Sequence, residues 1–242
     1  MRAMARATAG PRILCLALAL LAALAGRASA TTSFGNTTRI AIAGVGSNGS
    51  DIFVSGLGTS LLHVSVTVSQ LTHSQVANLG LVLVGPTGAA LVLEGGCGGT
   101  SSVSNISLLF SDSAAATLPQ SSFPSGTYKP TQYGSLGSFP PPGPGLAYES
   151  PAPARTFTLF SVFSGSNPNG HWKLYAYDPV SGDTGQIARG WSLQIDATPA
   201  QLPALPRGGD WILVALLGVT VSLASSRRLL GTTRRGASAR RQ

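Results

Sequence analysis

The sequence predicts an all-β protein whose central part folds as an antiparallel β-sandwich or jelly roll. Three observations in residues 31–198 lead to this prediction: there is almost no helical periodicity, Gly, Ser, Thr and Pro abound, and short alternating apolar runs lie between turn residues. Such runs are typical of half-buried strands in sandwiches and barrels. A segment of this length buries roughly 70% of its unfolded surface, which is enough for one core.

The first half of this region contains four predicted strands. Residues 62–68 alternate apolar and polar side chains, which places Leu62 and three valines on the core face. Residues 79–84 and 91–93 form two further strands, joined across a Gly-Pro-Thr-Gly sequence that is typical of a turn. The apolar residues at alternate positions of 106–110 indicate a fourth strand.

Two strands with the same alternation close the region. Residues 172–177 and 191–196 each place every second side chain on an apolar face, and a polar, glycine-containing loop from 178 to 190 is expected to join them. Trp172 and Trp191 begin these apolar faces. They are therefore the predicted anchors of the core.

Between these halves, residues 118–154 shift to a Pro- and Gly-rich composition that does not fit a central strand. A linker between two domains is one interpretation. Because each flank has too few strands to close a sheet alone, a long surface excursion within one sandwich is favoured.

Residues 1–30 have the parts of a secretory signal peptide. Several arginines precede a 13-residue apolar run, and Ala28 and Ala30 form a small-x-small cleavage site. The run is too short to span a bilayer comfortably. Cleavage is expected after Ala30, which predicts export to the cell envelope or surface.

The C-terminal end is predicted to tether the protein to a membrane. Residues 199–210 form a Pro-containing linker or sorting motif, 211–226 a transmembrane helix, and 227–242 a basic cytoplasmic tail. This arrangement resembles bacterial sorting signals of the PEP and IPTL type, although its motif differs from both. Tethering and release after processing of the tail both remain open.

The charge distribution argues against nucleic-acid binding. The net charge of +8 belongs to the two ends, because residues 31–206 hold five basic and seven acidic side chains. The region between leader and tail is therefore slightly acidic.

Two sequence blocks resemble the P/Homo B domain, the galactose-binding-like β-sandwich that follows the subtilisin-like domain in proprotein convertases and also occurs on bacterial surface proteins. The first block is Leu-Thr-His at 71–73 followed by the apolar strand and Pro-x-Gly of 78–88. The second comprises 167–175 and 182–193. Asn78 and Gly80 stand where the family commonly has acidic residues. The resemblance implies a protease-associated accessory role.

Two weak ligand sites are candidates. Asp178 and Asp183 flank one loop, and Asp112 or Asp51 could approach it to complete an oxygen-rich calcium site, although solvated turn aspartates are the favoured interpretation. No other cofactor is expected. Tyr175 shares a strand face with its neighbour at 177, and this pair could stack on a sugar; ordinary cross-strand packing is the alternative.

No catalytic residue is assigned, and the chain is predicted not to be an enzyme. No recognisable serine nucleophile motif accompanies its three histidines, His63, His73 and His171. Cys97, the one cysteine outside the leader, lies among glycines on an expected loop where its thiol could be exposed. The predicted function is a non-catalytic module for surface binding, adhesion or structure, with a protein, protease or surface glycan as partner. An accessory role in serine-type proteolysis and carbohydrate binding are the alternatives.

Overall fold

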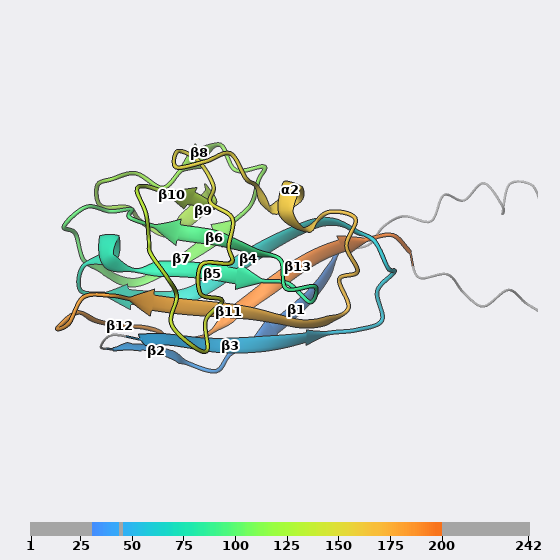
Figure 1. Ribbon diagram of the computed structural model, residues 1–242, viewed down its shortest axis with the longest axis horizontal. Coiled ribbons are helices and arrows are strands. Elements are labelled where there is room, and N and C mark those ends of the chain that lie inside the picture. Colours follow the sequence, from blue (N-terminus) through green and yellow to red (C-terminus); the bar gives the residue numbers. More distant parts are fainter. Residues whose placement is uncertain (1–30, 44–45, 200–242) are drawn as a thin grey trace, which may run out of the picture. The chain divides into compact units, whose positions relative to one another are not determined.

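The computed structural model describes residues 31–43 and 46–199, and this part of the chain is mostly β. Its strands form two sheets that pack face to face, with few helical residues (Figure 1). The predicted leader, transmembrane helix and basic tail lie outside the described residues, as does the linker of 199–210 apart from Pro199. Within the described ranges, no helix has the length and apolar character needed to cross a membrane.

The larger sheet has eight strands in the order β1-β13-β4-β7-β9-β8, and β12 pairs with both β2 and β4. Its strands are β1 (Thr32–Asn36), β2 (Ile40–Ala43), β4 (Leu61–His73), β7 (Val103–Phe110), β8 (Ala116–Thr117), β9 (Gly126–Lys129), β12 (Thr184–Ile187) and β13 (Trp191–Ala197).

The smaller sheet has five strands in the order β10-β6-β5-β11-β3. They are β3 (Gly46–Val54), β5 (Gly80–Val84), β6 (Ala90–Gly95), β10 (Thr131–Gln132) and β11 (Gly170–Asp178). A short 3-10 helix, η1 (Val76–Asn78), follows β4, and a single turn of α-helix, α2 (Leu159–Phe163), precedes β11.

The sheets are mixed, and the prediction of purely antiparallel pairing is wrong in three places. β7 with β9, β8 with β9 and β6 with β10 are parallel pairs. All three involve the short strands between 116 and 132, where the chain returns beside a strand after a crossover instead of a tight hairpin. The longer strands pair antiparallel, as expected.

The hairpin of β5 and β6 forms where the sequence predicts it. Its turn closes when the N–H of Gly88 donates to the carbonyl of Gly85 over 3.0 Å. Gly88 has a φ of +87°, a conformation that a side chain would strain. The glycine therefore sets the turn that brings the two strands together.

The predicted strand at 62–68 is confirmed as part of β4, but the inward placement of Leu62 is wrong. Leu61 is 1% exposed and Leu62 36%. The register explains this difference, because Asp196 of β13 lies opposite His63 whereas Ala197 lies opposite Leu61. Leu62 is thus the extra residue of a β-bulge, which turns its side chain outward.

The expected loop from 178 to 190 contains strand β12, so the prediction of a simple connection is wrong. β11 and β13 lie in different sheets, and the chain crosses between them through this strand. A four-residue polar strand with a glycine in it gives too little apolar alternation to be recognised in sequence.

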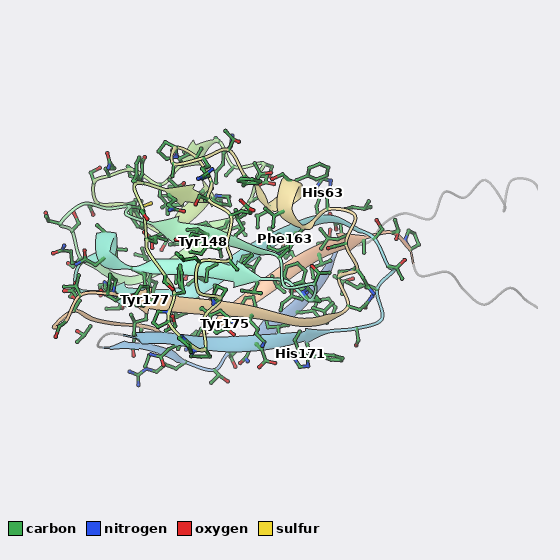
Figure 2. All side chains as sticks on the ribbon, in the orientation of Figure 1. His63, Tyr148, Phe163, His171, Tyr175 and Tyr177 are labelled. Atoms are coloured by element: carbon green, nitrogen blue, oxygen red, sulfur yellow. The ribbon has the colours of Figure 1, made fainter. Side chains whose placement is uncertain are left out.

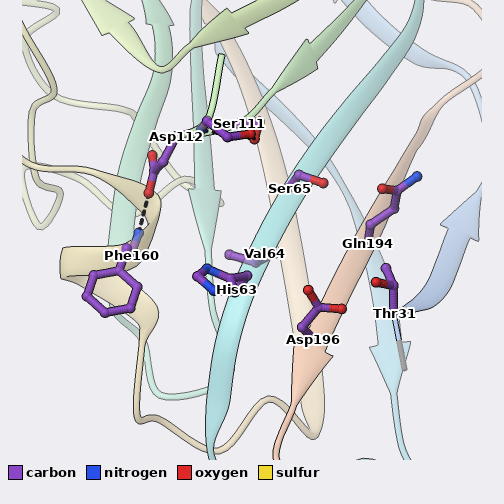
Figure 3. A pocket seen from close by; sticks show the side chains of 10 residues that line it. Thr31, His63, Val64, Ser65, Ser111, Asp112, Phe160, Gln194 and Asp196 are labelled. Carbon is purple, nitrogen blue, oxygen red and sulfur yellow. Dashed lines mark hydrogen bonds between the residues drawn. The ribbon is translucent and has the colours of Figure 1, made fainter. Parts of the chain in front are cut away.

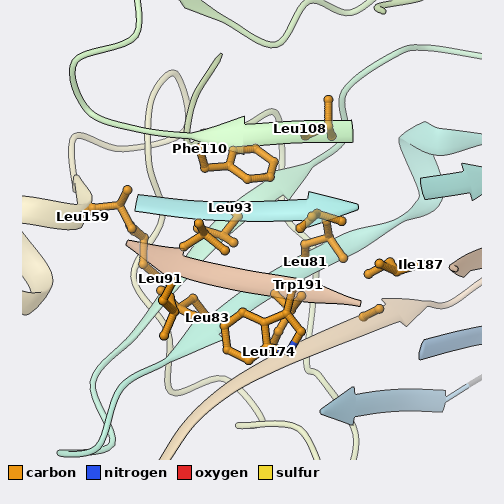
Figure 4. Packing of buried hydrophobic residues seen from close by; sticks show 14 of the residues in the cluster. Leu81, Leu83, Leu91, Leu93, Leu108, Phe110, Leu159, Leu174, Ile187 and Trp191 are labelled. Atoms are coloured by element: carbon orange, nitrogen blue, oxygen red, sulfur yellow. The ribbon is translucent and has the colours of Figure 1, made fainter. Parts of the chain in front are cut away.

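One large apolar cluster fills the space between the sheets (Figure 4). Trp172 of β11 and Trp191 of β13 face it from opposite sheets, at 0% and 2% exposure. The Trp172 ring lies 5.2 Å from Phe163, centroid to centroid, and its Nε1–H donates to the carbonyl of Pro168. Trp191 donates to the hydroxyl of Ser50. Each indole thus has a partner for its one polar group.

The Pro-rich segment 118–154 crosses the outer face of the smaller sheet, as Figure 1 shows. Phe139 is fully buried there against Val82, Ala90 and Tyr175 in a second apolar cluster. The backbone of Glu149 bonds to β6 in both directions, accepting from Val92 and donating to Ala90. The excursion therefore covers a sheet face that would otherwise be exposed.

Candidate functional site

A pocket of about 330 Å³ lies on the outer face of the larger sheet, beside α2 (Figure 3). We call it the α2 pocket. His63 and Ser65 of β4 and Gln194 and Asp196 of β13 line it, because they alternate with core residues on the two paired strands. The remaining lining residues are Thr31, Val64, Ser111, Asp112, Ser113 and Phe160.

Asp112 fixes the helical wall of this pocket. Its two carboxylate oxygens accept from the N–H groups of Leu159, at 3.0 Å, and Phe160, at 2.7 Å. Thr158 and Ser161 add a reciprocal capping box at the same helix end. Asp112 therefore satisfies backbone donors that α2 leaves free.

Removing the Asp112 carboxylate should destabilise the fold modestly. Asp112→Ala leaves two N–H groups of α2 without their acceptor, and we expect a loss of about 1–2 kcal/mol in the free energy of unfolding. Denaturant titration measures it. Asp51→Asn, an exposed carboxylate on the other sheet, is the control and should change stability by less than about 0.5 kcal/mol. Equal effects of the two variants would contradict the capping role.

The α2 pocket combines polar groups with an aromatic wall. Phe160 is 54% exposed, and its ring centroid lies 6.0 Å from that of His63. Asp196 lies opposite His63 in the strand register, and its Oδ1 is buried without a hydrogen-bond partner. Such a lining suits a small polar group that brings a donor to this carboxylate.

The first calcium candidate, Asp178, is nearly fully buried at the end of β11. Its Oδ2 lies 3.1 Å from Nε2 of the buried His73, although the two do not meet hydrogen-bond geometry. Its Oδ1 accepts from the N–H of Val180 at 2.7 Å. Burial raises the pKa of the Asp178 carboxyl, and the N–H of Val180 and the nearby His73 oppose that rise.

The second candidate, Asp183, is held by polar side chains at the other end of the same turn. It accepts from the amide of Asn78 at 2.6 Å and from the hydroxyl of Ser74 at 3.0 Å. These hydrogen bonds, the one from Asn78 above all, lower the pKa of Asp183. Asn78 thus acts as a donor to a carboxylate.

These contacts do not assemble a calcium cluster. Asp51 lies opposite Lys173, five residues along β11 from Asp178, which corresponds to roughly 17 Å. In residues 31–43 and 46–199, no group of three His, Cys, Asp or Glu side chains is placed to hold a metal ion. Calcium binding by Asp178, Asp183 and Asp112 stays a prediction. The protein's own donors already occupy both oxygens of Asp183 and Asp112 and Oδ1 of Asp178.

Tyr175 and Tyr177 share the outer face of β11, but they do not form an open platform (Figure 2). Tyr175 is only 8% exposed. Phe139 of the Pro-rich segment lies 5.5 Å from the ring of Tyr177, centroid to centroid. Sequence periodicity places both rings on one face, but it does not show that Phe139, from a distant segment, covers that face.

A second groove runs along β3 and β11 on the outer face of the smaller sheet. We call it the β3–β11 groove. Its lining residues are Gly49, Ser50, Asp51, Pro142, His171, Lys173 and Tyr175. Tyr175 lies close over Gly49, where a β-carbon would clash with its ring, so the glycine makes room for the aromatic floor. The volume is about 510 Å³.

The rim of this groove is charged and aromatic. Nδ1 of His171 lies 2.7 Å from Oδ2 of Asp51, and both side chains are more than half exposed. Phe53, directly opposite His171 in the register, is 62% exposed and packs its ring 5.0 Å from the imidazole. An exposed phenylalanine beside such polar groups is typical of the anchor residues in protein interfaces.

The fully buried carboxyl group of Glu94 is not among the candidates expected from the sequence. Its Oε1 accepts from the N–H of Cys97 at 3.3 Å, while its Oε2 has no hydrogen-bond partner. The buried Oε1 of Gln132, on the neighbouring strand β10, is also unpartnered. Burial raises the pKa of Glu94 well above its ordinary value. The surrounding apolar run of 90–95 was the available signal, because a charged residue within it has no exposed face to occupy.

The expectation of an exposed Cys97 is wrong. The thiol is fully buried and contacts the carbonyl oxygens of Gly95 and Thr131, each at 3.6 Å. Burial, followed by the nearby Glu94 carboxyl, raises its pKa. Because the surrounding glycines let the backbone fold tightly, the side chain turns into the core and behaves as a small apolar group.

The described fold defines this protein as a mostly β, sandwich-like module whose surface hollows include the α2 pocket and the β3–β11 groove. No family model matches the chain, and no curated protein does. Among solved structures, the complex of Aeromonas sobria serine protease and its chaperone aligns at 18% identity and a TM-score of 0.36, covering 76% of this chain and 30% of that one. The serine protease of Aeromonas sobria aligns at 16% identity and a TM-score of 0.34, covering 74% and 29%. The chain thus spans less than a third of the length of these neighbours, and similarity at this level supports no inference about function.

Proposed function

We propose that the chain is an exported, non-catalytic β-sandwich module of the P/Homo B type that binds a protein partner through the β3–β11 groove. The observation that carries the proposal is the exposed Phe53 at the rim of a groove with an aromatic floor. The partner class implied by the sequence resemblance is a subtilisin-like serine protease. In this proposal the leader directs export and the C-terminal segment tethers the module to the envelope.

The composition of the groove favours a polypeptide over a sugar. Carbohydrate sites need an open aromatic face, and Tyr175 offers little of its ring. Phe53 can instead enter an apolar pocket of a partner, while Asp51, His171 and Lys173 supply hydrogen bonds of both senses. The carbohydrate-binding alternative therefore loses its best-placed pair of rings.

The contacts of the histidines support a non-catalytic module. Within residues 31–43 and 46–199, no histidine is hydrogen-bonded to a serine hydroxyl: His73 is buried beside Asp178, and His171 pairs with Asp51. A serine hydrolase needs such a contact to activate its nucleophile. His63 of the α2 pocket is the residue to test, since Ser65 and Asp196 line the same hollow.

Binding measurements with matched variants test this function. The full chain is assayed by biolayer interferometry against a subtilisin-like protease from the same organism. Phe53→Ala should weaken binding about tenfold or more, because an exposed aromatic anchor is lost. Phe160→Ala, which removes a similarly exposed phenylalanine from α2, is the control and should leave affinity unchanged.

Two results would contradict the proposal. Equal loss of affinity in both phenylalanine variants, or no binding at all, would remove the β3–β11 groove as the interface. Labelling of the chain by a serine-directed probe, abolished by His63→Ala, would show that the module is an enzyme.

A further inference from the structure

Thr31 occupies the position next to Asp196 in the larger sheet. β1 begins at Thr32, which lies opposite Ile195 of β13, and the two strands run antiparallel. The next residue on each strand is therefore Thr31 opposite Asp196, at the roughly 5 Å between Cα atoms that cross-strand neighbours have. Both residues line the α2 pocket, and Figure 3 draws them on the same side of it.

Asp196 has a carboxylate oxygen without a hydrogen-bond donor at this position. Ile195 and Ala197 are buried on the core face, so Asp196 between them faces outward. Its Oδ1 is nevertheless buried and lacks a hydrogen-bond partner. A buried carboxylate oxygen without a donor costs free energy, which a nearby cation would recover.

We propose that cleavage after Ala30 creates an α-ammonium group on Thr31 that pairs with the Asp196 carboxylate and completes the wall of the α2 pocket. This inference rests on the export step of the proposed function. Cleavage is a hydrolysis by a signal-peptidase-type enzyme: water breaks the peptide bond between Ala30 and Thr31, its oxygen joins the Ala30 carbonyl carbon, and the freed nitrogen takes up protons. An uncharged peptide nitrogen thereby becomes a cation beside an unpaired acceptor.

The other charged groups around Asp196 leave this role open. His63 faces it from β4, and Asp112 lines the pocket from the loop after β7. Asp112 already bonds to α2 through both oxygens. The new ammonium group therefore meets one available carboxylate, and the pair reduces the negative charge of the pocket before any ligand enters. The N-terminus becomes anchored to β13 as the leader departs.

The pKa of the Thr31 α-amino group tests this pairing directly. The chain from Thr31 to Gln242 is produced in detergent by cleavage of a removable fusion, and its amines are reductively methylated with ¹³C-formaldehyde. With two lysines in the sequence, few resonances compete with the α-amine in the NMR titration. We expect a pKa at least about half a unit above that of a dimethylated α-amine without a nearby charge, because the carboxylate favours the charged form. Asp196→Asn should return it to that value, and Asp51→Asn should leave it raised.

The outcomes separate the pairing from the export step. A pKa that is the same in the wild type and Asp196→Asn overturns the ion pair, whatever happens in the cell. N-terminal sequencing of the exported protein gives the second arm. The exported protein could begin at a residue other than Thr31 while the engineered chain still shows the raised α-amino pKa. In that case the ion pair can form, but processing in the cell does not create it, and the export step is the part that is wrong.

Discussion

Replacing Trp172 with alanine is expected to lower the free energy of unfolding by roughly 3–5 kcal/mol, the largest effect of any single substitution considered for this fold. The indole is fully buried, packs against Phe163, and donates its N–H to Pro168. Removing it leaves a cavity between the sheets and an unpaired buried carbonyl. Because domains of this size are stable by only about 5–15 kcal/mol, much of the protein should unfold at moderate denaturant concentration.

Phe53→Ala provides the matched control for this substitution. Phe53 lies on the neighbouring strand β3 but points outward, with most of its ring in solvent, so its removal should cost less than about 0.5 kcal/mol. Urea titration followed by tryptophan fluorescence, in which the buried Trp191 serves as a reporter in both variants, measures both. A loss below about 1 kcal/mol for Trp172→Ala would mean that the two faces of β11 are inverted.

The strands with strong alternation could be predicted from sequence because each one carries its own signal. In β11 and β13, every second residue is apolar, and the residues predicted to face the core are buried; Tyr175, on the outer face of β11, is buried as well. Period-2 alternation is a local property, so it needs no knowledge of the partner strand. The bulge that exposes Leu62 depends on the register with β13, which a single strand does not encode.

The candidate sites were harder to predict because they depend on contacts between distant segments. Tyr175 is covered by Phe139, 36 positions earlier in the chain, and Asp112 bonds to α2, 47 positions later. Neither contact has a local pattern. The α2 pocket likewise combines Thr31 with Asp196, which only the pairing of the first and last strands brings together.

Replacing Glu94 with glutamine is expected to stabilise the protein at neutral and alkaline pH and to flatten the pH dependence of its stability. Burial raises the pKa of Glu94 in the folded state above its unfolded value of about 4.3. Between these two pKa values the folded protein holds a proton that the unfolded chain has released. Stability therefore falls as pH rises through this window, by up to about 1.4 kcal/mol per pH unit, and is highest below the unfolded pKa. Glutamine has the same shape and does not ionise, so this penalty disappears.

The comparison of two glutamate variants isolates this effect. Denaturant titrations from pH 4 to pH 8 should show Glu94→Gln and wild type close together at pH 4 and diverging as pH rises, with the variant more stable. Glu149→Gln removes the other glutamate of the sandwich, which is exposed, and should follow the wild-type curve. Parallel curves for Glu94→Gln and wild type would mean that the Glu94 carboxyl ionises in the folded state as readily as in the unfolded chain. If the stability curves of Glu94→Gln and wild type diverge increasingly with pH, a carboxyl group must stay protonated in the core beside Cys97. An exposed glutamate does not produce such a divergence.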